Sequence, residues 1–535
     1  MCSHCEPGGW AATRSKSTGL DKSRNCVRRN LQISVGIFAK SDAKRENLVS
    51  TTITSPAGAA RGAAVSLVAQ VFRFIIQMVG LALLSRLLEP SAFGLLAMIL
   101  AVVGLATVLG DFGLSLAAVQ APTLSQAQKS ALFWVNALIG VLAGVCVFCL
   151  SGPLAIFYER PELTALTQLL ALVFLLNALS AQFRVELTRR LDFVGLAWSD
   201  ALGPLGGLTI GVGMALAGFG VWALAWQQIA GAGFTLAVLV VRARWVPGSL
   251  LPMPNLRNFL AFGVATTSTQ VLNYASVNIA SVAVGKVLGA STLGIYSRAF
   301  QIFMLPLQQM AAPLTRVALP ILSRLVGDER YSAYVCRAQL LMSYSLVPAL
   351  LAMALVAEPV VRLVLGPGWE DAGSVLRILC FGGVFQALGY TYYWVFLSKA
   401  RMGVMLGCEL VGRVVMIALT LALANFGIDY VAAAYSIGLF MIWLVSSAFG
   451  LRLVGISAAA LLGVTLRPVS LFFGIFVLIA GADWLLDFQQ YGAFVHLGIL
   501  VTLSMLLFAI AIAALRSLRS DLGIVLATGR MALKR

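Results

Sequence analysis

Long apolar stretches separated by short polar links make up the chain from residue 62 onward. A helix needs about twenty mostly apolar residues to cross the hydrocarbon core of a bilayer. The pattern predicts fourteen membrane-spanning helices, at 63–86, 92–117, 130–151, 164–184, 195–217, 220–241, 259–284, 291–315, 338–357, 373–396, 403–425, 429–451, 460–481 and 493–515. Because every link is short, no folded soluble domain fits between these helices.

Segments about 200 residues apart resemble each other in the same order along the chain. The matching pairs are LSRLLEPSAFGLL (84–96) with VGKVLGASTLGIY (284–296), LTRRLDF (187–193) with LSKARMG (397–403), and GFGVWAL (218–224) with NFGIDYV (425–431). The first pair matches Arg86 with Lys286 and Gly94 with Gly294. Three matches in one order indicate an internal repeat.

Each repeat holds six predicted helices, an even number, so both repeats insert into the membrane the same way up. The predicted fold is an all-α membrane protein with two parallel six-helix bundles, arranged as a V-shaped transporter, and two additional C-terminal helices. The predicted parts are a disordered basic tail (1–61), an N-terminal bundle (62–252), a C-terminal bundle (253–453), the two further helices (454–516) and a second tail (517–535).

Composition agrees with a membrane protein. Hydrophobic residues make up 60% of the chain and charged residues 11%, compared with about 45–50% and about 25% in soluble domains. The net charge of +17 could indicate nucleic acid binding, but the basic residues lie in the links between apolar stretches. We therefore expect no nucleic acid partner.

The basic residues also predict the orientation, because cytoplasmic links retain Lys and Arg. Alternate links, starting with the second, carry fourteen of them, whereas the other links carry only Arg86, Arg160, Lys286 and Arg362. Both termini are therefore expected to face the cytoplasm.

The chain offers few groups for catalysis. Its two histidines, His4 and His496, have no evident catalytic partners, and the phosphate-binding motif GxxxxGK[ST] is absent. Cys2 and Cys5 lack the second pair that a zinc site needs. We expect a transporter rather than an enzyme, with no cofactor and no metal.

Ionisable residues inside spans cost about 2.5–3.5 kcal/mol each at a helix centre on insertion scales, and they commonly mark functional sites. Gln70, Arg73 and Gln77 share one face of the first predicted helix, which predicts the wall of a wet cavity. Arg298 and Arg377 lie some way inside their helices, and a guanidinium can hold a diphosphate through paired hydrogen bonds. The alternatives are a structural hydrogen bond to another helix for the first set, and snorkelling to the headgroups for the two arginines.

Two further groups are candidates for other roles. Glu409 and Arg413 are spaced to form an ion pair on one helix face. Tyr390, Tyr393 and Trp394 could stack on sugar rings, although aromatic residues in spans more often serve packing or interfacial belts.

Several segments resemble the polysaccharide synthesis family of flippases, within the multidrug, oligosaccharidyl-lipid and polysaccharide exporter superfamily. They are LLSRLLEPSAFGLLAMI (83–99), FRVELTRRLDF (183–193), GFGVWAL (218–224) and LGIYSRAFQIFMLPLQQMAAPLTRVALPILSRL (293–325), of which the last is the most specific.

The resemblance implies a multi-pass protein of the bacterial cytoplasmic (inner) membrane. Its substrate would be an undecaprenyl-diphosphate-linked oligosaccharide, moved by alternating access for O-antigen, exopolysaccharide or capsule synthesis. Membrane lipids would be further partners, and a polysaccharide polymerase and a chain-length regulator are candidate ones. The alternatives are an ion-coupled multidrug antiporter and a peptidoglycan-precursor flippase. Deep arginines favour an anionic substrate over a cationic drug, and the stretch at 293–325 argues against the precursor flippase.

Overall fold

A computed structural model describes residues 56–111, 118–119, 124–248, 256–515, 518–519, 521 and 523. The predicted tail at 1–61 lies outside these residues except for its last six, and so does most of the predicted tail at 517–535. The chain divides into two compact units, Met1–Val68 and Ala69–Arg535. The first unit contains the described beginning of α2, and the second contains the rest of α2 and all other described helices.

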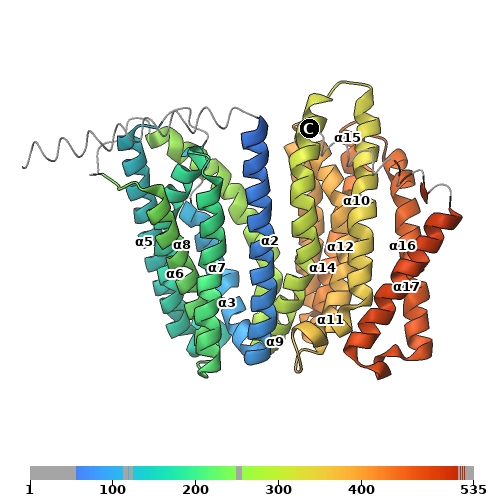
Figure 1. Ribbon diagram of the computed structural model, residues 1–535, viewed down its shortest axis with the longest axis horizontal. Coiled ribbons are helices and arrows are strands. Elements are labelled where there is room, and N and C mark those ends of the chain that lie inside the picture. The colour runs from blue at the N-terminus through green and yellow to red at the C-terminus, as the bar shows by residue number, and fades with distance from the viewer. Residues whose placement is uncertain are drawn as a thin grey trace, which may run out of the picture. The chain divides into compact units, whose positions relative to one another are not determined.

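Every regular element in the described part of the chain is helical (Figure 1). The long helices are α2 (Pro56–Leu87), α3 (Pro90–Asp111), α5 (Gln126–Tyr158), α6 (Glu162–Arg189), α7 (Phe193–Leu216), α8 (Val221–Ala243), α9 (Leu256–Arg324), α10 (Arg330–Leu355), α12 (Asp371–Ser398), α13 (Met402–Leu423), α14 (Ile428–Val445), α16 (Ala458–Leu486) and α17 (Ala493–Ala514). The shorter ones are α11 (Ala357–Val364), α15 (Leu451–Leu453), the 3-10 turns Ala424–Phe426 and Phe488–Tyr491, and the π-helical turn Ser446–Gly450.

Helix α9 combines two of the predicted spans. Its residues keep helical torsion angles except at Gly289, where φ is +84°. A side chain would be strained at that angle, so glycine permits the chain to change direction there. The predicted helices at 259–284 and 291–315 are therefore the two arms of α9, on either side of Gly289.

Eleven helices among the described residues are long and apolar enough to cross a membrane. The set leaves out α7, whose many glycines, Asp200 and Pro204 lower its hydropathy. It also omits α3, which contributes only the shorter apolar helix Pro90–Gly104, and the part of α9 before Asn278. The chain is thus a multi-pass membrane protein.

The helix ends form two faces of the second unit. We call the face with the turns after Leu87 and Tyr158 the Glu89 face, and the opposite face, with the turns after Arg189 and Ser398, the Lys399 face. Antiparallel neighbours such as α5 with α6 and α7 with α8 pack against each other between the two faces.

Near the Glu89 face, α3 and the second arm of α9 approach each other so closely that only glycine fits at two positions. A Cβ atom added to Gly94 would lie 1.7 Å from the carbonyl oxygen of Ala290, and one added to Gly294 would lie 1.9 Å from that of Pro90. The contact is reciprocal, because Ala290 and Gly294 follow Pro90 and Gly94 at the same spacing in sequence. Small residues permit this close backbone packing in membrane helices.

We expect Gly94→Val to lower the free energy of unfolding by about 1–3 kcal/mol, because the added side chain must push α3 away from α9. Thermal unfolding of the purified protein in detergent measures the change as a lower Tm. Gly233→Val is the matched control, since a Cβ at Gly233 in α8 meets no atom within 4 Å. An equal loss of stability in both variants would contradict the close contact.

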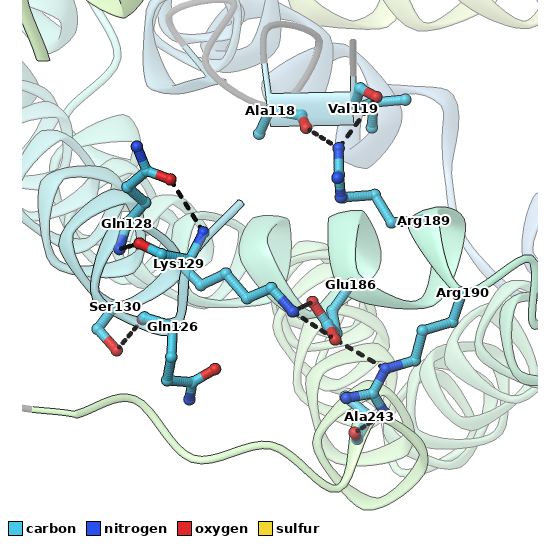
Figure 2. A network of polar contacts seen from close by, with 11 residues as sticks. Ala118, Val119, Gln126, Gln128, Lys129, Ser130, Glu186, Arg189, Arg190 and Ala243 are labelled. Carbon is cyan, nitrogen blue, oxygen red and sulfur yellow. Dashed lines mark hydrogen bonds and ion pairs between the residues drawn. The ribbon is translucent and has the colours of Figure 1, made fainter. Parts of the chain in front are cut away.

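At the Lys399 face, Glu186 joins the ends of three helices (Figure 2). Its buried carboxylate lies 2.8 Å from Lys129 Nζ of α5 and 2.7 Å from Arg190 Nε at the end of α6. Arg190 in turn donates a hydrogen bond of 2.9 Å to the carbonyl oxygen of Ala243 at the end of α8. One carboxylate therefore compensates two cations and fixes α5, α6 and α8 relative to each other.

Glu186→Gln should lower the free energy of unfolding by about 1–3 kcal/mol, because it leaves the partly buried Lys129 without a carboxylate. The Tm in detergent again provides the measurement. Asp328→Asn removes the carboxylate partner of Arg330, whose side chain is 80% exposed, and it should change the Tm little. If the two variants behave alike, Glu186 does not hold the helices together.

Candidate functional site

A cavity of about 560 Å³ lies among α2, α3, α6, α7, α8 and the second arm of α9. Its polar lining consists of Arg73, Gln77, Asn177, Gln227, Gln228, Thr235, Arg298 and Gln301. No carboxylate of the described residues lines it. The cavity, which we call the arginine cavity, therefore offers two positive charges and several neutral amides to a ligand.

Arg73 and Gln77 reach the cavity from the middle of α2. Their spacing of four places both on one helix face, and both residues are exposed. Gln70 is not among the lining residues, and its amide donates a hydrogen bond of 3.2 Å to Gln309 Oε1 of α9. Of the three residues predicted to share a cavity wall, two line the cavity and the third makes an interhelical hydrogen bond.

Arg298 comes from α9, nine residues beyond the break at Gly289, or about 13 Å along the helix. It donates a hydrogen bond to Gln301, and its Cζ atom lies 4.0 Å from the centre of the Phe93 ring. Its Nε atom is buried and has no hydrogen-bond partner in the described structure. A buried donor without a partner is costly, so this guanidinium is suited to receive an anion.

The positive charge of the cavity is not neutralised from within the described residues. Neither Arg73 nor Arg298 forms an ion pair with a described carboxylate. In the low dielectric of a membrane interior, such charges act on a ligand more strongly than they would in water. The cavity thus favours anions.

Arg377 lies elsewhere and is compensated. Its Nη2 atom is 2.9 Å from Glu358 Oε1, and its Nε atom donates a weaker hydrogen bond of 3.4 Å to the carbonyl oxygen of Ala354. It lines neither the arginine cavity nor the second cavity. The ion pair joins α12 to α11 and the hydrogen bond joins α12 to the end of α10, which gives Arg377 a structural role.

A second cavity, of about 230 Å³, lies among α12, α13, α14 and the π-helical turn. Tyr390 and Tyr393 line it together with Trp443 and other aromatic residues. Glu409 and Arg413 also line it and form an ion pair with an N–O distance of 3.0 Å. This cavity combines aromatic faces with a neutral charge pair.

Trp394, the third aromatic residue predicted to contact sugar, does not line either cavity. It is 1% exposed, and its indole N–H donates a hydrogen bond of 2.9 Å to Thr315 Oγ1 of α9. The structure therefore gives it a packing position between α12 and α9.

The uncharged amides Asn177, Gln227, Gln228 and Gln301 complete the arginine cavity, and a search for charged residues within spans does not find them. A signal was present, because Gln227 and Gln228 interrupt an apolar helix and Gln301 lies one turn beyond Arg298. Polar amides inside spans, like charges, need a polar partner or water.

Residues 83–374, more than half of the chain, match the family described as polysaccharide biosynthesis protein. The chain belongs to this family. It is 28% identical over 351 residues to the lipopolysaccharide biosynthesis protein WzxC of Escherichia coli (strain K12). The aligned region covers 64% of this chain and 70% of WzxC. It is 27% identical over 308 residues to the succinoglycan biosynthesis transport protein ExoT of Rhizobium meliloti (strain 1021), covering 57% and 62% of the two chains.

The fold is also similar to a solved structure of the lipid II flippase MurJ in an inward closed conformation. The TM-score is 0.66 over 84% of this chain and 98% of that one, at 14% sequence identity. At this identity the similarity concerns the fold alone. The family match confirms the resemblance to the polysaccharide synthesis family that the sequence indicated. The transport protein ExoT among the relatives agrees with a transporter rather than an enzyme.

Proposed function

We propose that this protein is a flippase that moves undecaprenyl-diphosphate-linked oligosaccharide repeat units across the bacterial inner membrane for surface polysaccharide synthesis. The observation that carries the proposal is the cavity at mid-height of the helices with two arginines and no described carboxylate. Family membership and the names of WzxC and ExoT support a role in exporting a polysaccharide precursor.

The diphosphate would bind between Arg73 and Arg298, which lie on different helices and can contact different phosphate oxygens. Guanidinium groups form charge-assisted, paired hydrogen bonds with phosphates, and the unpartnered Nε of Arg298 supplies a donor already placed in the cavity. The neutral amides, such as Gln227 and Asn177, would bind the sugar hydroxyls near the diphosphate. The isoprenoid chain would remain in lipid, where its burial costs nothing.

The architecture we propose has fourteen spanning helices in two six-helix repeats with two additional helices. Three of these spans, α3, α7 and the first arm of α9, would come in addition to the eleven helices that are long and apolar enough among the described residues. The reciprocal contact of Gly94 and Gly294 supports a pseudo-twofold relation between the repeats. With the basic links on the Lys399 face, that face would be cytoplasmic, as would both termini.

A multidrug antiporter of the same superfamily is less compatible with this cavity. A cationic substrate needs carboxylates or aromatic faces without competing positive charge, whereas Arg73 and Arg298 would repel it. A peptidoglycan-precursor flippase also takes a diphosphate lipid, and the likeness to MurJ concerns the fold. The family match therefore favours polysaccharide precursors.

The second cavity suits the sugar part of the substrate. Aromatic faces pack on the apolar faces of sugar rings, and the Glu409–Arg413 pair can exchange hydrogen bonds with hydroxyls without adding net charge. We propose that Tyr390 and Tyr393 contact sugars in this way. A polysaccharide polymerase and a chain-length regulator would then receive the flipped unit.

Arg73→Ala and Arg298→Ala should each lower transport at limiting substrate by about tenfold to a hundredfold, as expected for the loss of a hydrogen bond to a charged group. The measurement is the amount of undecaprenyl-linked oligosaccharide trapped in the cytoplasmic leaflet of a deletion strain that carries each variant. Arg467→Ala is the matched control, because Arg467 also lies within a span but lines neither cavity. Normal export by both cavity variants at normal protein levels would contradict the proposal.

Tyr390→Leu and Tyr393→Leu should lower transport about twofold to tenfold, the range expected for loss of an aromatic contact. The same trapping assay measures this effect. Tyr430→Leu is the control, since Tyr430 is 51% exposed and lines neither cavity. If all three tyrosine variants transport equally well, the second cavity does not contact sugar.

A further inference from the structure

At the Glu89 face, the end of α2 is joined to the segment between α11 and α12, far away in sequence. The indole N–H of Trp369 donates a hydrogen bond of 2.9 Å to the carbonyl oxygen of Ser85. Trp369 is 1% exposed and Ser85 is 3% exposed. Beside them, the Arg86 guanidinium donates a hydrogen bond to the carbonyl oxygen of Leu363. We call these contacts the Glu89-face closure.

A further contact also joins the first and second halves of the chain at the Glu89 face. Lys286 Nζ of α9 lies 2.6 Å from Glu159 Oε1 at the end of α5, and this hydrogen bond and charge attraction lower the pKa of Glu159. The Glu159 side chain is 81% exposed, and exposed pairs of this kind stabilise little. The buried contact of Trp369 with Ser85 is therefore the stronger part of the connection.

Phe93 links this closure to the arginine cavity. Its ring packs edge to face against Trp369, with ring centres 5.4 Å apart and an interplanar angle of 61°. The guanidinium of Arg298 lies over the same ring, with Cζ 4.0 Å from its centre. Phe93 is 2% exposed, so one buried ring touches both the cavity arginine and the tryptophan of the closure.

An anion in the cavity competes with the Phe93 ring for the guanidinium. The ring attracts the cation through its quadrupole, and that attraction is greatest where water is excluded. A phosphate offers full negative charge and paired hydrogen bonds, including one to the unpartnered Nε of Arg298. Binding would thus draw Arg298 from the ring and remove the cation contact on the side of Phe93 that faces the cavity arginine, while the ring contact with Trp369 is left without it.

We propose that Phe93 is a positioning residue that couples anion binding at Arg298 to release of the Glu89-face closure. This inference rests on the proposed function, because it takes the diphosphate of the substrate as the anion. Phe93 itself does not line the cavity. Its role is to transmit occupancy of the cavity to Trp369.

The coupling can be measured as a distance across the Glu89 face. Spin labels are attached at Phe219→Cys and Phe426→Cys in a chain whose eight native cysteines are replaced. Pulsed electron paramagnetic resonance then measures the distance between the labels, which increases when the Glu89 face opens. Both positions are exposed, at 54% and 69%, and lie on turns of different halves. The probe ligand is undecaprenyl diphosphate, and its binding is measured separately on the same samples.

In the otherwise unchanged protein, undecaprenyl diphosphate should raise the ratio of long to short distances at least about fivefold, the lower end of ordinary coupling between sites. In Phe93→Leu, the ligand should still bind, but the ratio should be raised without ligand and change less than twofold on binding. Phe93→Met is the second variant if leucine impairs folding. Phe174→Leu is the matched control, since Phe174 is a buried phenylalanine of the same core with no ring contact to Trp369 or Arg298 in the described structure.

The outcomes separate the two proposals. Failure of the unchanged protein to bind undecaprenyl diphosphate overturns the proposed function and the coupling with it. Binding without a change in distance overturns the coupling and leaves the function standing. A ligand response in Phe93→Leu or Phe93→Met equal to that of Phe174→Leu also overturns the role of Phe93.

Discussion

The cost of an uncompensated charge in lipid decides the arrangement of polar groups in this protein. Two groups of charged residues within or beside the helices illustrate this cost. In one group a partner compensates them, as Glu358 does for Arg377 and Glu409 does for Arg413. In the other group, Arg73 and Arg298 lack a described carboxylate partner and line one cavity. Since a charge at membrane depth without a partner or water is costly, a ligand or water must complete this second group, and the cavity is where it can do so.

Hydropathy predicted an all-helical, multi-pass membrane protein, because backbone groups in lipid must be hydrogen-bonded within their own segment and few structures meet that condition. The arginines of the cavity were predictable because a charged side chain inside a span is costly and needs polar surroundings. Sequence spacing could not tell which neighbour a side chain would meet, so Gln70 and Arg377 were grouped with the cavity although Gln309 and Glu358 bind them. Trp394 was likewise grouped with the sugar-binding candidates, although it donates a hydrogen bond to Thr315 of another helix. The pattern of one helix does not predict such a contact between helices.

The segments 84–96 and 284–296 match in sequence and belong to different halves of the chain. The matched segments contact each other, with Gly94 against Ala290 and Gly294 against Pro90. Arg86 and Lys286, matched in the same alignment, each reach an acceptor in the opposite half of the chain. A reciprocal contact of this kind is what a twofold relation produces, so both halves would hold the Glu89 face shut by related means.

The departures from that relation are where the substrate would be recognised. At the same offset of 200 residues, Met98 is the counterpart of Arg298 and Leu293 the counterpart of Phe93, and both counterparts are fully buried apolar residues. The counterpart positions Met98 and Leu293 thus do not reproduce the cation held on an aromatic ring. A symmetric arrangement would respond equally at both related positions. Arg298, Phe93 and Trp369, each in contact with the next, occur at only one of them and would respond to one anion in one cavity. The related contacts between the halves would form and break as the Glu89 face closes and opens. The asymmetric set of Arg298, Phe93 and Trp369 would determine when this happens.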